Sequence, residues 1–173
     1  MKQEILKHLK LIEEKNNVKI LYAVESGSRA WGFASTDSDY DVRFIYVRKK
    51  EDYLRLDPYS DVIEYVLDET LDINGWDISK ALKLLFASNP TLIEWLFSPI
   101  VYLESKEIEE LRLLAEKYYS PKTLAHHYQH IALNQYKLHI SDRKEVRLKK
   151  YFYFMNQVLY ITRQELISQA SNT

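Results

Sequence analysis

The feature that most constrains the fold is a polar stretch, residues 25–40, that connects two apolar segments. These segments, 18–24 and 41–47, have the length and composition of buried β-strands. Only three glycines occur in the chain, and two of them, Gly27 and Gly32, lie in the connecting stretch. Because glycine allows the backbone to turn sharply where a strand ends, the pattern predicts a strand, a tight turn and a second strand.

Two aspartates follow the turn and suggest a metal site. Asp39 and Asp41 are two residues apart, so their side chains point to the same side if the second strand begins at or just before Asp39. Paired carboxylates repel each other unless a cation lies between them, and hard oxygen ligands suit Mg²⁺ or Mn²⁺. Backbone N–H groups and the hydroxyl of Gly27-Ser28 allow close approach of a phosphate. This layout favours in-line attack on a nucleoside triphosphate, and an ordinary polar turn is the alternative.

A second acidic strand lies downstream and offers two candidates for a further carboxylate at the site. Asp72 lies between two apolar residues of the predicted strand 70–74, so its side chain faces either solvent or a site. Asp77 directly precedes the predicted helix 78–87 and is most simply its N-cap. Asp72 is therefore the preferred third carboxylate and Asp77 the alternative, with Gly75 between them predicted to turn the chain from sheet to helix.

These motifs resemble a known superfamily. Gly27-Ser28 followed by Asp39-x-Asp41 resembles the signature of the DNA polymerase β-type nucleotidyltransferases. The full string 27–47, GSRAWGFASTDSDYDVRFIYV, resembles more specifically a branch of predicted nucleotidyltransferases of bacteria and phages that is associated with RNA repair. The likeness continues through Gly75-Trp76-Asp77, the segment 88–99 and Lys149-Lys150-Tyr151, and so covers nearly the whole chain.

The resemblance implies transfer of a nucleoside monophosphate from an NTP such as ATP to a hydroxyl acceptor, for example an RNA end, with release of pyrophosphate. Mg²⁺ or Mn²⁺ would be held by the catalytic carboxylates Asp39, Asp41 and Asp72. The triphosphate would be held by Gly27, Ser28, Arg29 and Lys150. For Lys150 a solvated helix face is an equally good reading, and Arg43, which shares the parity of Asp39 and Asp41, is expected to pair with one of them.

Two alternatives to this activity stay open. One is a module that binds nucleotide without turning it over. The other is a transferase of the toxin–antitoxin type, whose acceptor is a protein or a tRNA. The resemblance also suggests that related chains continue beyond Thr173 with more helix, so that part of the acceptor surface is either missing here or supplied by a second subunit, as in a homodimer.

Composition and periodicity indicate the fold class. The chain has 173 residues, a formal net charge of −1 and no cysteine, so neither a disulfide framework nor a thiolate metal site is expected. No signal peptide or membrane span is apparent, which predicts a soluble cytoplasmic protein without a membrane partner. His126, His127 and His130 are interpreted as polar helix surface.

We expect an α+β fold: a small mixed-sheet nucleotidyltransferase core, 1–100, flanked by helices, and a helical C-terminal region, 101–173, with a soft boundary between them.

The periodicity also predicts the individual elements. A helix is expected at 1–15, and strands at 61–67 and 70–74 add to the two around the polar stretch. Further helices are expected at 91–97, 105–119 and 121–140, with a last one from 143 to about 170, and 100–103 is expected to be extended.

Overall fold

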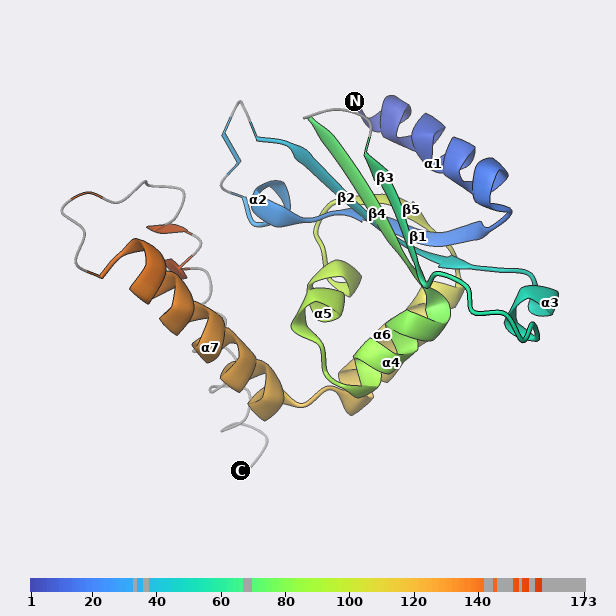
Figure 1. The fold of residues 1–173 in the computed structure, drawn as a ribbon. Helices are drawn as coiled ribbons and strands as arrows, with labels where there is room; N and C mark the ends of the chain where they lie inside the picture. The colour runs from blue at the N-terminus through green and yellow to red at the C-terminus, as the bar shows by residue number, and fades with distance from the viewer. Residues whose placement is uncertain are drawn as a thin grey trace. The chain divides into compact units, whose positions relative to one another are not determined.

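The structure is a computed structural model and describes residues 1–32, 34–35, 38–66, 70–141, 145, 151–152, 154–155 and 158–159. Seven helices and five strands lie in this part of the chain (Figure 1). The helices are α1 (Lys2–Asn16), α2 (Gly27–Ala30), α3 (Lys50–Tyr53), α4 (Ile78–Phe86), α5 (Pro90–Leu96), α6 (Glu107–Tyr118) and α7 (Pro121–His139). The strands are β1 (Lys19–Glu25), β2 (Tyr40–Val47), β3 (Val62–Val66), β4 (Leu71–Asp77) and β5 (Val101–Glu104).

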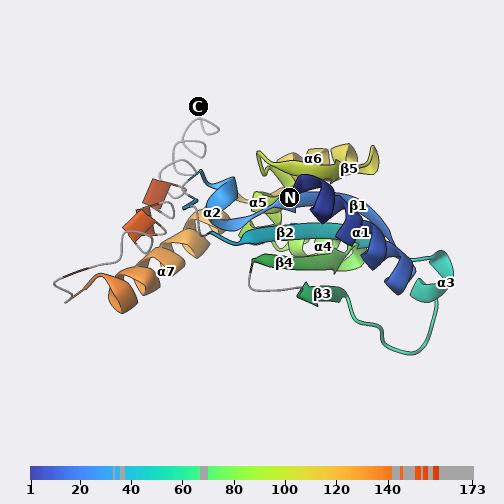
Figure 2. The same cartoon turned by 90° about the horizontal axis from the view of Figure 1, so that it is seen from above.

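The five strands form one mixed sheet in the order β3-β4-β2-β1-β5 (Figure 2). β2 and β4 are parallel, whereas the other three neighbouring pairs are antiparallel. Sequence and structure agree on an α+β fold with a small mixed sheet flanked by helices, which confirms the predicted fold class. The predicted last helix falls largely outside the described residues.

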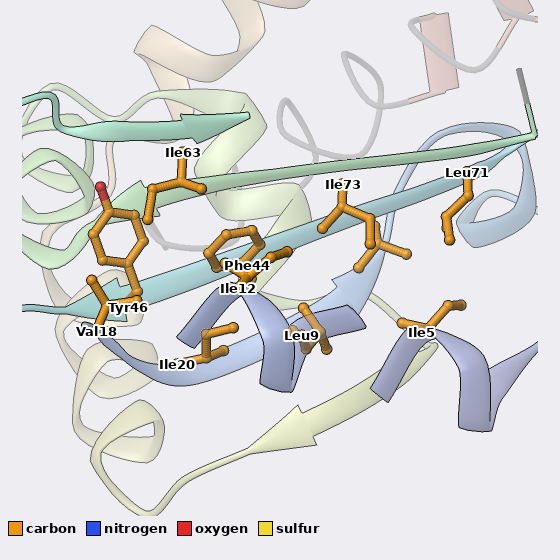
Figure 3. Packing of buried hydrophobic residues seen from close by; sticks show 12 residues of the cluster. Ile5, Leu9, Ile12, Val18, Ile20, Phe44, Tyr46, Ile63, Leu71 and Ile73 are labelled. Carbon is orange, nitrogen blue, oxygen red and sulfur yellow. The ribbon is translucent and has the colours of Figure 1, made fainter. Parts of the chain in front are cut away.

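One face of the sheet is covered by α1. Ile5, Leu9 and Ile12 recur at helical spacing and are buried against the sheet, where they meet side chains such as Phe44 and Ile73 (Figure 3). α1 is capped by Asn17, which has a left-handed backbone (φ 51°) and donates its N–H to the carbonyl of Glu13.

The opposite face is covered by α4, α5 and α6. A second cluster of buried residues joins these helices to β1 and β2, and includes Ile45, Leu85, Trp95 and Leu111. Because both faces are covered, β1 is buried along its whole length after Lys19.

Gly75 has a different role from the one predicted. The sequence predicts a turn there, but β4 continues through Gly75 to Asp77. A Cβ at this position would lie 2.1 Å from the ring of Phe44, its partner across β2 and β4. Gly75 therefore makes room for a buried aromatic ring, which a sequence pattern of one strand does not reveal.

By its internal contacts the chain forms two compact units, Met1–Ala87 with Thr91–Tyr118, and Ser88–Pro90 with Tyr119–Thr173. The sheet and α1, α4 and α6 belong to the first unit. In the second unit α7 begins at Pro121, and the Ser120 side chain caps it by accepting a hydrogen bond from the N–H of Thr123. The boundary near residue 100 stays a prediction, and β5 on its C-terminal side pairs with β1. Within the described ranges, no helix is both long and apolar enough to cross a membrane.

Candidate active site

Asp41 and Asp72 lie side by side on the parallel strands β2 and β4. They are partners in the strand register, and partners in a parallel pair point to the same side of the sheet. Arg43 follows on that side of β2, and its Nη2 donates to Asp41 Oδ1 at 3.1 Å and to Asp72 Oδ2 at 2.8 Å. The side chains of Asp41 and Asp72 are 32% and 47% exposed, so a solvent-borne ligand can reach them. One guanidinium nitrogen thus lies between two accessible carboxylates.

Gly27 lies directly against the Asp41 carboxylate. Its backbone has φ +61°, and a Cβ there would lie 2.3 Å from Asp41 Oδ2. Both the conformation and the space therefore require glycine. The preceding residue, Ser26, donates its N–H to the carbonyl of Asp41 at 2.8 Å, which fixes the turn to the start of β2.

Glu25, the last residue of β1, is hydrogen-bonded to the main chain of Asp41. Its Oε1 accepts the N–H of Asp41 at 2.9 Å, and its Oε2 accepts the hydroxyl of Tyr102 at 2.5 Å. Glu25 is fully buried, and this burial raises the pKa of its carboxyl. Burial, followed by the hydrogen bond to Glu25, also raises the pKa of Tyr102, so the phenol stays protonated and donates. Neither residue is recognisable as part of the site from the sequence, because they are 77 positions apart and no local pattern connects them.

Arg29 contacts the segment before β2, whereas Ser28 is buried. The guanidinium of Arg29 donates to the carbonyls of Ser38 and Asp39 and lies 3.8 Å above the ring centroid of Tyr40. It therefore holds the segment that leads into β2. Ser28 is buried in α2, with 4% exposure.

The remaining predicted ligand, Asp39, is exposed and lies one residue before β2 begins. The structure thus brings Asp41 and Asp72 together and leaves Asp39 at the entrance of the strand. Within the described residues no group of three or more His, Asp or Glu side chains is arranged to hold a metal ion jointly. The Asp41–Asp72 pair nevertheless fits a divalent cation in its chemistry, because two carboxylates converge on one positive charge.

Asp77 is remote from this pair. It caps α4, since its Oδ1 accepts the N–H of Ser79 at 2.8 Å, and its Oδ2 accepts the hydroxyl of Tyr53 at 3.1 Å. It is fully buried and lies five residues beyond Asp72, or about 16 Å along the strand, on the opposite face. The N-cap interpretation of Asp77 is confirmed.

The chain is similar to proteins of a known family. Residues 1–165 match the RlaP family, described as the RNA repair pathway DNA polymerase beta family. The chain belongs to this family. It is also 50% identical over 160 residues to the uncharacterized protein YcgL of Bacillus subtilis (strain 168), an alignment that covers 92% of this chain and 61% of that protein. The chain therefore spans about three fifths of the length of this curated relative.

Membership in the RlaP family confirms the resemblance of the string 27–47 to a polymerase β-type family associated with RNA repair. Lys150, the other predicted triphosphate contact, lies outside the described residues. His126, His127 and His130 all lie on α7 of the second unit. Burial lowers the pKa of His127, which favours its neutral form.

Proposed function

We propose that this RlaP-family chain is a metal-dependent nucleotidyltransferase. It transfers a nucleoside monophosphate from an NTP to a hydroxyl acceptor, an RNA end, and releases pyrophosphate. The observation that carries the proposal is the Asp41–Asp72 pair, two accessible carboxylates on neighbouring parallel strands. The guanidinium of Arg43 lies between these carboxylates, and the Gly27 turn lies against that of Asp41.

In this proposal Asp41 and Asp72 hold Mg²⁺ or Mn²⁺, and Asp39 joins them from the segment before β2. The metal ion would supply charge compensation at the triphosphate and at the departing pyrophosphate. Asp72 accepts the proton of the acceptor hydroxyl, since its carboxylate is the more exposed of the pair. The acceptor oxygen then forms a bond to the α-phosphorus. The bond from that phosphorus to the oxygen that bridges it to the β-phosphorus breaks, and pyrophosphate leaves.

The remaining residues position these groups. Gly27 leaves the space in which the Asp41 carboxylate sits, and Glu25 fixes the main chain of Asp41. Arg29 keeps the Asp39 segment next to α2 and contributes a positive charge for the triphosphate. The turn that Ser28 and Gly27 form at the start of α2, together with Lys150, is proposed to contact the phosphates. ATP as the nucleotide, a homodimer and a cytoplasmic location belong to the same proposal.

The test incubates the purified protein with each labelled NTP, Mg²⁺ or Mn²⁺, and total RNA. We expect metal-dependent label on RNA, and we expect Asp41→Asn to lower the rate by about a hundredfold or more. Asp57→Asn is the matched control, because Asp57 is an 81% exposed surface carboxylate paired only weakly with Arg55 at 3.5 Å.

Each outcome has a consequence. Label on protein instead of RNA would replace the acceptor in the proposal by a protein. Bound nucleotide without pyrophosphate release, or wild-type activity in Asp41→Asn, would contradict the catalytic proposal.

A further inference from the structure

Arg43 is fixed within the site by more than its ion pairs. While Nη2 reaches the carboxylates of Asp41 and Asp72, Nη1 donates to the main-chain carbonyls of Val42 at 3.1 Å and Asp72 at 3.2 Å. The Arg43 side chain is only 17% exposed, less than either aspartate. Its guanidinium is therefore a built part of the site and not a solvated surface charge.

The position of Nη2 conflicts with a divalent ion held by the same pair. The nitrogen lies between Asp41 Oδ1 and Asp72 Oδ2, where an ion shared by these oxygens would have to lie. Oxygens bound to one Mg²⁺ lie about 2.1 Å from it, closer than either oxygen lies to Nη2. A divalent ion and a guanidinium at this place would also repel each other strongly. Binding of a metal ion shared by Asp41 Oδ1 and Asp72 Oδ2 therefore requires Nη2 to withdraw.

We propose that Arg43 is the resident counter-cation of the site, a positioning residue that holds Asp41 and Asp72 together in the metal-free protein and gives up both carboxylates when a divalent ion binds. The inference rests on the proposed function only in taking these two carboxylates as metal ligands. It adds that Arg43 lowers the affinity of the site for metal, because each metal ion must displace it. An arginine with a merely structural role predicts the opposite, since without it the two carboxylates would move apart and bind metal less well.

The experiment measures Mn²⁺ binding to the full chain from the loss of the free Mn²⁺ signal in electron paramagnetic resonance. We expect Arg43→Met to bind Mn²⁺ about tenfold more tightly than the wild type, since two half-exposed ion pairs no longer compete. Arg55→Met removes the same charge from an exposed side chain paired with Asp57, and we expect it to leave the affinity unchanged. Adding Asp41→Asn should abolish binding in both the wild-type and the Arg43→Met backgrounds.

A second readout needs no binding signal. In urea denaturation without metal, Arg43→Met should unfold at lower urea than the wild type, because the carboxylates then face each other without a cation. Added Mn²⁺ should stabilise Arg43→Met more than it stabilises the wild type. Arg43→Gln retains a neutral donor and repeats both measurements if the methionine variant does not fold.

The outcomes separate the inference from the proposed function. If Arg43→Met and Arg43→Gln bind Mn²⁺ no more tightly than the wild type, while Asp41→Asn removes wild-type binding, the inference is overturned and the metal site stands. If no variant binds Mn²⁺ differently from Asp41→Asn, the metal site itself is refuted and the inference falls with it.

Discussion

Replacing Gly27 with alanine perturbs the site at its closest contact. The positive φ of +61° alone costs about 1–2 kcal/mol for a residue with a Cβ. The added Cβ would lie 2.3 Å from Oδ2 and 3.2 Å from Cγ of Asp41, so the carboxylate must rotate away. An off-rotamer side chain and a weakened pair with Arg43 add about 1 kcal/mol. We therefore expect a total loss of about 2–3 kcal/mol in the free energy of unfolding.

Gly32 provides the matched control. It also has a positive φ, +80°, but a Cβ there would have no atom of the described residues within 4 Å. Gly32→Ala should therefore show the backbone cost of about 1–2 kcal/mol alone. Asp41→Ala offers a second control, because it removes the atoms that overlap most and leaves only its own Cβ, 3.6 Å from the new one. In that background Gly27→Ala should likewise cost only the backbone amount.

Urea denaturation of the single and double variants in metal-free buffer gives these free energies, and the double-mutant cycle isolates the coupling between Gly27 and Asp41 as about 1 kcal/mol. In the transfer assay Gly27→Ala should lose at least about a hundredfold in rate, because it displaces a proposed ligand, while Gly32→Ala keeps most of its activity. A coupling near zero, or equal activity in the two alanine variants, would refute the reasoning from the overlap.

Three further predictions concern buried or paired polar residues elsewhere on the sheet and at its ends. Asp77→Ala should lower the free energy of unfolding by about 2–4 kcal/mol, since it removes the cap of α4 and a buried hydrogen-bond acceptor. Asp72→Asn should lower it by under about 1 kcal/mol but abolish nucleotide transfer. Denaturation and activity assays on both variants test this contrast. Glu25→Ala should cost about 1–3 kcal/mol by orphaning the N–H of Asp41, and Glu25→Gln, which keeps an acceptor, clearly less in the same denaturation assay. Burial raises the pKa of Tyr53 to about 12 in the folded protein. The contribution of its protonated hydroxyl to the free energy of unfolding is therefore complete below the unfolded pKa of about 10 and declines as the pH rises toward 12. Urea titrations at about pH 9 and 11 should show the wild type losing stability relative to Tyr53→Phe.

Much of the core could be predicted from the sequence because its signals are local. Apolar periodicity located α1 and the strands, and the alternation of apolar and polar residues in 71–73 placed Asp72 on the face opposite Leu71 and Ile73, which the burial pattern of β4 matches. Asp77 before an apolar helical pattern was correctly interpreted as a cap. Each of these inferences depends only on residues that are close together in the sequence, within a single helix or strand or at its end.

What could not be predicted depends on which strands become neighbours. Glu25 accepts from Tyr102 only because β5 pairs with β1, and Arg43 reaches Asp72 only because β2 lies parallel to β4. The role of Gly75 likewise follows from the place of Phe44 on the next strand. Long-range pairing leaves no trace in the composition of a single segment.

The core and the site are nevertheless fixed by the same register. Gly75 is paired with Phe44, and the absent Cβ accommodates the ring, so β2 and β4 fit together in this alignment. Three residues earlier on each strand the same alignment pairs Asp41 with Asp72. A slip of one residue in either strand would turn its apolar side chains out of the α1 face and its carboxylate into it, at a high cost in burial and desolvation. The packing beneath α1 therefore holds the two carboxylates opposite each other on the far face, and the geometry of the proposed metal site follows from the hydrophobic core rather than from the acids, which repel.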